Sequence, residues 1–376
     1  MRFIHTADWQ IGMKRHFLDG DAQARFSEAR EEAIKTIGKL AREHSAAFVV
    51  VAGDVFEANM LSPRTVRRAL EAMRSIPVPV YLLPGNHDHL GPATIYHSPE
   101  FLRQKPDNVQ VLESSDMVEG PGGVEIVGVP WMAKQLVEDQ VGAVVQDLPP
   151  AAGRLRVVVG HGGTEAMGRQ DDLGIIDIAT VEEAMRQGKL HYLALGDRHS
   201  TTSLGSTGRL WYSGAPEPTD YDEVDAGNAL LVDLQPNAIE VTSIHTGTWH
   251  FVERMLDVEA GAAGGVFESF LDNLPDKART IVKVNFRGTI GMLDRMKLDE
   301  VLERQRDVFG AIERHEHRDE LAVMPDSGDF GDLSLAGYAK AALDRLASGA
   351  AHPDPTESQR YRDALALYYR VAQEVR

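Results

Sequence analysis

Short apolar runs recur along the chain up to about residue 245. Several are near-continuous stretches of Val and Leu that close with Gly and a polar residue, a pattern typical of sheet strands buried on both faces. Helical patterns lie between them at 24–45 and 62–76, and Ser62 followed by Pro63 predicts a helix start. This alternation predicts a layered α/β domain over residues 1–246. Its strand-like runs are FVVVAGD, VYLLPGNHD, VEIVGVPW, LRVVVGHGG, HYLALGDRHS and ALLVDL.

The pattern changes beyond this domain. Glycine and alanine become frequent between 247 and 265, and the sequence then reads as helix, strand, helix, which predicts a small α+β domain at 250–325. A polar stretch, MPDSGDFGD, leads to two more helical patterns separated by the breaker GAAHPDPTES. We expect these two helices to form a C-terminal segment at 330–376.

The composition is that of a globular protein. A length of 376 residues favours two units over one core, and 43% hydrophobic with 26% charged residues leaves little room for long disorder. The chain has no cysteine, which excludes disulfides and thiolate metal sites and suits the reducing interior of a cell. The stretch RFIHT lacks the regions of a signal peptide, and no apolar run approaches the ~20 residues of a membrane span. We therefore expect a cytoplasmic protein without a membrane segment.

The formal net charge of −18 argues against a protein that grips polyanions with its general surface. A substrate that carries phosphate must then be held locally. Bound divalent cations would do this, and the carboxylates that bind them would contribute to the negative charge of the chain.

Polar side chains collect just after the predicted strands, where open α/β sheets place their ligands. Their mixture of carboxylate, amide and imidazole suits Mn, Fe, Zn or Mg. Each of these side chains alone is weak evidence for a metal site, because Gly-Asp after a strand is usually a turn and a lone His is usually an ordinary polar group. The run GNHD is harder to explain by turn chemistry. The candidates are Asp8, Gln10, Asp54, Asn86, His87, Asp88, His161, Asp197 and His199.

Together these motifs resemble those of the calcineurin-like metallophosphoesterases, namely Asp-x-His, Gly-Asp, Gly-Asn-His-Asp or Glu, Gly-His and Gly-His-x-His. The closer likeness is to the SbcD branch, the nuclease subunit that works with the SbcC coiled-coil ATPase on DNA ends. It rests on specific motifs up to about residue 245 and on architecture alone beyond. The resemblance implies a β-sandwich flanked by helices, with the α+β domain as a cap and C-terminal helices. The motifs are IHTADWQIG, VVVAGDVFEANMLSP, PVYLLPGNHD, HYLALGDRHS and LWYSGAPEPTDYDE.

The resemblance also implies two metal ions that share Asp54. A shared ligand suits two cations about 3.5–4 Å apart, which stabilise the attacking and leaving oxygens of an in-line displacement. His87 would donate a proton to the leaving oxygen, with Asp88 or Glu57 orienting its imidazole. By this resemblance the first ion would be held by Asp8, Gln10, Asp54 and His199, and the second by Asp54, Asn86, His161 and Asp197.

Two of these positions depart from the family's motifs. Gln10 stands in place of the His of Asp-x-His, and Asp197 in place of the first His of Gly-His-x-His. An amide oxygen is a weaker ligand for transition metals than imidazole, whereas Asp197 adds a third carboxylate to Asp8 and Asp54. More oxygen donors favour harder ions, so the sequence predicts Mn²⁺ first, then Mg²⁺, over Zn²⁺.

The implied function is two-metal hydrolysis of DNA phosphodiesters in DNA repair and recombination, as an exonuclease and as an endonuclease at ends or hairpins. No G-x-x-x-x-G-K-[ST] loop occurs in the chain, so ATP would be hydrolysed by a separate SbcC-like subunit. Two alternatives stay open. The same metal pair would serve a small-molecule phosphatase or phosphodiesterase, and the lost His ligands would suit a catalytically weakened scaffold of the same complex. A homodimer is compatible with each of these functions.

The predicted C-terminal helices are the expected docking segment for the ATPase. Each carries an apolar stripe, which would pack either on the chain's own domain or on a partner's helices. The resemblance favours the base of an SbcC-like coiled coil, bound through residues 330–376. The stripes consist of Leu335, Tyr338, Ala342 and Leu346, and of Leu365, Tyr368, Tyr369 and Ala372.

Two further groups of polar residues have plainer interpretations. The loop residues Lys14, Arg15 and His16 would contact a DNA backbone only if they face the site, and solvated side chains are the more ordinary outcome. His315 and His317 in ERHEHRDE have metal-like spacing, but residues two apart do not share a helix face, which predicts a solvated charged helix.

Overall fold

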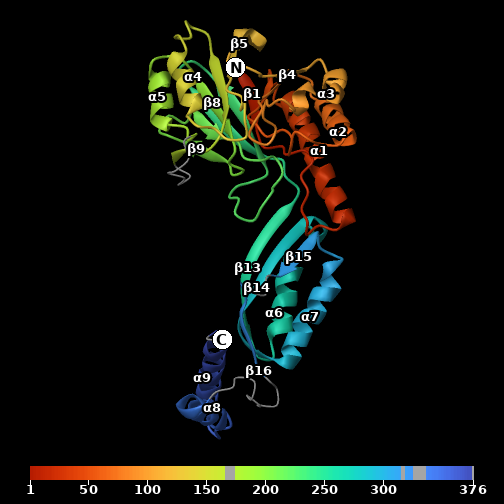
Figure 1. Cartoon of the computed structure of the whole chain (residues 1–376), viewed down its shortest axis with the longest axis vertical. Coiled ribbons are helices and arrows are strands. Elements are labelled where there is room, and N and C mark those ends of the chain that lie inside the picture. The colour runs from red at the N-terminus through yellow and green to blue at the C-terminus, as the bar shows by residue number, and fades with distance from the viewer. Residues whose placement is uncertain (166–173, 315–317, 325–335, 375–376) are drawn as a thin grey trace. The chain divides into compact units, whose positions relative to one another are not determined.

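The computed structural model describes residues 1–165, 174–314, 318–324 and 336–374 (Figure 1). The chain folds into two compact units, Met1–Trp249 and His250–Arg376. The finer division of the second unit into a cap domain and a separate helical segment stays a prediction. Within the described ranges, no helix combines the length and the apolar character needed to cross a membrane.

The first unit contains two six-stranded sheets. The first sheet has the order β12 (Ile239–His245), β11 (Asn228–Leu234), β1 (Arg2–Thr6), β2 (Val49–Val51), β3 (Val80–Leu82) and β4 (Val109–Val111). In the first sheet β1, β2, β3 and β4 run parallel, and the antiparallel strands β11 and β12 complete one edge. The second has the order β5 (Met117–Glu119), β6 (Glu125–Gly128), β7 (Arg156–His161), β8 (Tyr192–Gly196), β10 (Leu210–Tyr212) and β9 (Thr202–Leu204). In the second sheet β6, β7, β8 and β10 run parallel, with an antiparallel strand at each edge.

Helices cover the outer face of each sheet (Figure 1). The predicted helix start at Ser62 is confirmed, because its hydroxyl accepts a hydrogen bond from the Thr65 amide at 3.1 Å and Pro63 is the first helical residue. The α/β class and the flanked sandwich are therefore confirmed. The first sheet packs on α1 (Gly20–Glu43), α2 (Pro63–Arg74), η1 (Ile95–His97) and α3 (Pro99–Gln104), the second on α4 (Gln140–Asp147) and α5 (Ile178–Arg186), and η2 (Pro121–Gly123) precedes β6.

The two sheets share an apolar core that contains one polar link. Phe3 and Phe48 stack with ring centroids 4.8 Å apart, and Tyr192 of the second sheet meets Phe3 edge-on. His5 accepts from the Tyr192 hydroxyl through Nδ1 and donates to the Leu195 carbonyl through Nε2, at 3.0 and 3.1 Å. Burial lowers the pKa of His5 to about 3, so the ring stays neutral and holds β1 to β8 just below the strand ends.

The second unit contains a four-stranded parallel sheet, and two of the unit's helices pack on this sheet around a core that includes Phe267 and Phe286. The predicted helix, strand, helix order is present, but the expected Gly/Ala-rich stretch at 247–265 contains a long strand. This strand was missed because most of its side chains are only partly buried or exposed, while its backbone pairs with the next strand over ten positions. The elements are β13 (His250–Glu259), α6 (Ala263–Asp272), η4 (Lys277–Arg279), β14 (Thr280–Gly291), α7 (Met292–Arg306), β15 (Ala311–Arg314) and β16 (Glu320–Met324).

The prediction of a charged helix at 313–320 is wrong at both of its ends. Glu313 lies in β15 and Glu320 begins β16, and both strands pair in parallel with β14. Backbone pairing with a long neighbouring strand outweighs the local helical pattern of charges. His315 and His317 lie outside the described residues.

Two helices, α8 (Gly337–Gly349) and α9 (Pro355–Glu374), close the described chain. Leu343, Leu365 and Tyr369 are buried and form an apolar cluster with Ala322 of β16. Part of the predicted stripes therefore packs within its own unit. By contrast Tyr338 is 90% exposed, and Leu335 lies outside the described residues.

We predict that Phe48→Ala lowers the free energy of unfolding of the first unit by about 3–5 kcal/mol, because it removes a fully buried ring between the sheets. Leu102→Ala, at a side chain that is 59% exposed, should cost less than about 0.5 kcal/mol. Tryptophan fluorescence in a urea titration measures this unit selectively, since all four tryptophans lie within it. Equal losses in the two variants would contradict the assigned core.

Candidate metal centre

The candidate residues converge where the carboxyl ends of strands from both sheets meet. Asp8, Gln10, Asp54 and Asn86 follow β1, β2 and β3 of the first sheet, and His161, Asp197 and His199 end or follow β7 and β8 of the second. Parallel neighbouring strands end at the same edge of a sheet, which brings residues distant in sequence together. The link between β1 and β8 through His5 lies behind this edge.

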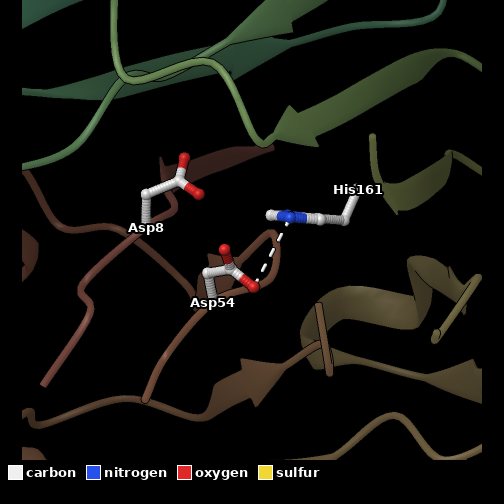
Figure 2. A group of neighbouring side chains, drawn as sticks. All are labelled: Asp8, Asp54 and His161. Atoms are coloured by element: carbon white, nitrogen blue, oxygen red, sulfur yellow. Dashed lines mark ion pairs between the residues drawn. The ribbon is translucent and has the colours of Figure 1, made fainter. Parts of the chain in front are cut away.

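Three side chains form the centre of the cluster. Asp8, Asp54 and His161 each offer a ligand atom, and these atoms lie within 4.8 Å of one another. Figure 2 shows the three side chains pointing toward one another, with His161 Nε2 3.5 Å from Asp54 Oδ1. All three are nearly inaccessible to solvent, at 0%, 2% and 1% exposure. Asp197 adds a carboxylate oxygen 3.8 Å from His161 Nε2.

The backbone of the candidate ligands adopts a conformation that such residues rarely take. The φ angles of Asp8, Gln10, Asp54 and Asp197 are 53°, 43°, 52° and 97°. Each such angle costs of order 1–3 kcal/mol and persists where the surroundings enforce it. The loops after β1 and β2 enforce this conformation through backbone hydrogen bonds. The Asp8 backbone amide donates to the Gly53 carbonyl at 3.0 Å, and the Gln10 backbone amide donates to the Asp54 carbonyl at 2.9 Å. Asp8 and Gln10 are thereby turned into the site.

The orientation of His161 is fixed by backbone atoms. Its Nδ1 donates to the Ala52 carbonyl at 2.8 Å, and this leaves Nε2 facing the carboxylates. The indole of Trp131 donates to the His161 carbonyl at 2.7 Å. A metal-ligating imidazole usually has such a partner on its other nitrogen, because that partner sets the tautomer and the ring angle.

Two glycines of the motifs allow this close packing. A Cβ on Gly53 would lie 2.1 Å from His161 Nδ1, and a Cβ on Gly85 would lie 2.2 Å from Asp54 Oδ1. Gly53 also has a φ of +94°, which L side chains rarely adopt. The Gly of Gly-Asp and of GNHD thus leaves the space that a neighbouring ligand occupies.

The two side-chain amides of the site fit a cation. One terminal atom of Asn86 lies 2.9 Å from His161 Nε2 and 3.0 and 3.1 Å from the two oxygens of Asp54. As nitrogen this atom donates to the two oxygens of Asp54, and as oxygen it would join that carboxylate around a metal ion. Gln10 Oε1 is buried without a hydrogen-bond partner among the described residues. A buried carbonyl oxygen without a partner beside two carboxylates is suited to a cation.

The charges of the cluster are strongly coupled. Burial raises the pKa of Asp8 to about 7, against the influence of His199 and His161. Burial alone would raise the pKa of Asp54, but His161 holds it below its ordinary value. Burial alone would likewise lower the pKa of both imidazoles, yet Asp54 raises that of His161 well above its usual range and Glu223 helps to raise that of His199 to about 9. Imidazolium protons therefore supply positive charge to the buried carboxylates, and metal ions would displace them.

His87 is oriented toward the site from the rim. Its backbone amide donates to Asp54 Oδ1 at 3.0 Å, and its Nδ1 donates to the Glu57 backbone carbonyl at 2.9 Å. Nε2 then lies 3.9 Å from Asp54 Oδ2, and the side chain is 37% exposed. The predicted orienting group is thus corrected to the backbone carbonyl of Glu57, because this oxygen is nearer to Nδ1 than the Glu57 carboxylate, which lies at 3.9 Å.

Asp88 has a different position from the one predicted. Its fully buried carboxylate accepts from the backbone amides of Gly85 and Phe56, at 2.7 and 3.0 Å, and from the Tyr96 hydroxyl. These contacts tie the GNHD turn to the loop after β2. Burial and the charge of Asp54 raise the pKa of Asp88 to about 6. Asp88 therefore acts on the shape of the turn, and the structure records no contact between its carboxylate and the His87 ring among the described residues.

His199 brings in residues to which the sequence analysis gave no role. Its Nε2 lies 3.3 Å from Gln10 Nε2, and its Nδ1 faces Thr219 Oγ1 at 2.6 Å and Glu223 Oε1 at 2.9 Å. Both lie in LWYSGAPEPTDYDE, a stretch that carries the family resemblance, and this was the signal available. Spacing alone does not reveal them, because they are 20 and 24 residues from His199.

Buried carboxylates, imidazoles and amides at the strand ends of a helix-flanked β-sandwich form a candidate metal site of the kind that two-metal phosphoesterases use. Residues 1–228 match the calcineurin-like phosphoesterase family, and the chain belongs to this family. The predicted family is therefore confirmed.

The curated relatives include proteins of DNA metabolism. The chain is 36% identical over 373 residues to the DNA double-strand break repair protein Mre11 of Archaeoglobus fulgidus, in an alignment that covers 89% of this chain and 79% of that protein. It is 25% identical over 272 residues to the SbcD component of the nuclease SbcCD of Escherichia coli K12, which covers 62% of this chain and 64% of the relative. The same component of the Rhodobacter capsulatus nuclease is 27% identical over 286 residues, 63% of this chain and 67% of the relative. The chain is thus a metallophosphoesterase related to the DNA repair protein Mre11 and to the SbcD component of the nuclease SbcCD.

We predict that Gly53→Ala displaces His161 and weakens metal binding at least tenfold, since the added Cβ would overlap the imidazole. Gly153→Ala is the matched control, because Gly153 has a similar φ of +85° and nothing within 4 Å of its Cβ position. Titration calorimetry with Mn²⁺ compares the two variants. Equal metal binding in both would show that the close approach of Gly53 to His161 does not matter.

Proposed function

We propose that this chain is a two-metal DNA nuclease that hydrolyses phosphodiesters at DNA ends or hairpins during repair. The observation that supports this most is the position of Asp54. Its two oxygens lie within 3.0–3.5 Å of the Asn86 amide, His161 Nε2 and the His87 backbone amide, and Asp8 is close by. A carboxylate placed between two ligand sets is the bridging group that a metal pair requires.

The two ligand sets follow from this bridge. In our proposal Asp8 and Gln10 complete the first site with His199, and Asn86 and His161 complete the second with Asp197. Asp54 is common to both. When bound, the metal pair would neutralise phosphate charge and supply an activated water for attack on phosphorus. The surrounding chain keeps the carboxylates dry and oriented for that purpose.

His87 is the proton donor in this proposal. With Nδ1 engaged by the Glu57 carbonyl, Nε2 is the nitrogen that faces the site, and its exposure leaves it accessible to a substrate. A protonated Nε2 would donate to the leaving oxygen as the P–O bond breaks. The role needs no metal contact from His87.

The donor set favours manganese. Three carboxylates and two amide oxygens stand against two imidazole nitrogens in the proposed sets, and oxygen-rich sets suit harder ions. We therefore propose Mn²⁺ as the preferred ion, with Mg²⁺ as a substitute.

The partner in this proposal is an SbcC-like ATPase that docks on residues 330–376. Support comes from the apolar side chains that α8 and α9 leave exposed, namely Tyr338 at 90%, Leu367 at 53% and Val371 at 48%. Exposed large apolar residues on neighbouring turns of one helix suit contact with partner helices. The absence of cysteine suits work in the cytoplasm.

The direct test is a cleavage assay with purified protein, alone and with its candidate ATPase. Linear duplex, hairpin and single-stranded DNA and a generic small diester are incubated with Mn²⁺, Mg²⁺ or a chelator. We expect manganese-dependent cleavage of DNA. Cleavage of the small diester alone would identify a small-molecule phosphodiesterase instead, and no cleavage of any substrate would identify a scaffold.

His87→Asn should lower the rate of DNA cleavage by about 10²–10⁴-fold, the usual contribution of a general acid, and leave metal binding intact. Turnover and bound manganese are measured on the same preparation. Unchanged turnover in this variant would remove His87 from the mechanism.

Leu367→Asp combined with Val371→Asp should abolish binding to the ATPase without changing metal content or DNA cleavage by the isolated chain. Val308→Asp, at another exposed apolar residue of the same unit, is the control. Co-purification with the ATPase measures the complex. Retained binding by the double variant would place the docking surface elsewhere.

A further inference from the structure

One loop, residues 215–225, holds His199 from both its backbone and its ring. The Ala215 amide donates to the His199 carbonyl at 3.1 Å, and the Val224 amide donates to the hydroxyl of the neighbouring Ser200 at 2.9 Å. On the ring, Nδ1 lies 2.9 Å from Glu223 Oε1. The loop therefore fixes where His199 stands and which way its imidazole turns.

The Glu223 carboxylate is itself held in place. Its side chain is 6% exposed, its Oε2 accepts from the Thr219 amide at 2.9 Å, and its Oε1 accepts from the Thr219 hydroxyl. The same hydroxyl lies 2.6 Å from His199 Nδ1. Thr219, 1% exposed, thus aligns the carboxylate with the imidazole N–H.

Two arginines fasten this loop to the segment that follows the first motif. Arg15 donates to the Thr219 carbonyl, and the buried Arg30 donates to the carbonyls of Glu217 and Pro218 at 3.4 Å each. The Arg30 guanidinium also lies over the Phe26 ring, 4.5 Å from its centroid. The loop is therefore anchored on α1, independently of the ligands that it orients.

The opposite side of the His199 ring faces the proposed first metal site. Nε2 lies 3.3 Å from the Gln10 amide nitrogen. Since Nδ1 is committed to Glu223, Nε2 is the nitrogen left for a metal. In the first proposed ligand set, His199 is the one nitrogen donor, because Gln10 stands where the family has His.

We infer that Glu223, aligned by Thr219, is a positioning residue that sets the affinity of the first metal site through His199. This rests on the two-metal centre proposed above. A carboxylate that accepts the Nδ1–H of a ligating imidazole fixes its tautomer and strengthens it as a donor. The first site depends on this support because Gln10 supplies only a neutral amide oxygen. The second site is independent of it, because His161 is oriented by the Ala52 carbonyl.

The test compares Mn²⁺ binding to the full chain and to four variants by titration calorimetry and electron paramagnetic resonance. Glu223→Gln removes the charge and Thr219→Val removes the aligning hydroxyl. Thr219→Ser keeps that hydroxyl, and Asp220→Asn changes an exposed carboxylate of the same loop that pairs with Arg15 at 3.6 Å. We expect Glu223→Gln to weaken one of two binding events by about 10–100-fold and to spare the other. Thr219→Val should act in the same direction, while Thr219→Ser and Asp220→Asn bind both ions normally.

The resonance signal separates a positioning role from a structural one. The wild-type chain should show a coupled manganese pair, and Glu223→Gln at the same concentration should show an isolated ion with an unchanged urea midpoint. Two normal binding events in Glu223→Gln overturn the inference, and so does an equal loss at both sites with a lower midpoint. A wild-type chain that binds fewer than two ions overturns the two-metal proposal as well. This test measures metal binding and does not measure DNA cleavage. A failure of the nuclease proposal would therefore be seen in the cleavage assay and not here.

Discussion

Two buried carboxylates set the constraint on which the site depends. Asp8 and Asp54 are withdrawn from solvent within a few ångströms of each other, in a left-handed backbone conformation that is uncommon for residues other than glycine. Burial of like charges is costly unless positive charge or hydrogen bonds offset it. The strand ends, the motif glycines and the hydrogen bonds between the loops hold these residues together against that cost. A cation between the carboxylates is the compensation that this arrangement implies.

The nearby imidazoles supply, from the protein's own side chains, the positive charge that offsets the buried carboxylates. The pKa of His161 is raised well above its usual range by Asp54, so a proton supplies charge that a metal ion would replace. Gln10 and Asp197, the two residues that depart from the family's motifs, also contribute to the charge and hydrogen-bond balance around the carboxylates. The Asp197 amide donates to both oxygens of Asp8 at 3.1 and 3.2 Å, and its carboxylate faces His161. Gln10 turns its amide nitrogen to His199, which leaves its buried carbonyl oxygen without a partner among the described residues.

The pattern of apolar runs predicts the layered α/β domain well, because strands buried on both faces are continuous in sequence. The sandwich arrangement of two sheets followed only from the family resemblance. The convergence of the candidate residues could also be predicted, since each ends or closely follows such a strand. The partners that orient these residues from elsewhere in the chain could not be predicted. Thr219 and Glu223 reach His199 through a long loop, and the partner of the His87 ring is a backbone carbonyl, which has no residue-specific signature. Strand β13 was missed for a related reason, because it is defined by pairing with β14 and carries few buried side chains.

The central claim is that Asp54 bridges two metal ions in an oxygen-rich site. Anomalous diffraction from crystals grown with Mn²⁺, collected on both sides of the manganese absorption edge, tests it directly. The account predicts two manganese peaks about 3.5–4 Å apart. Each peak should contact one oxygen of Asp54, with Gln10 and His199 at the first and Asn86, His161 and Asp197 at the second. A single peak, or two peaks that do not share Asp54, would contradict it.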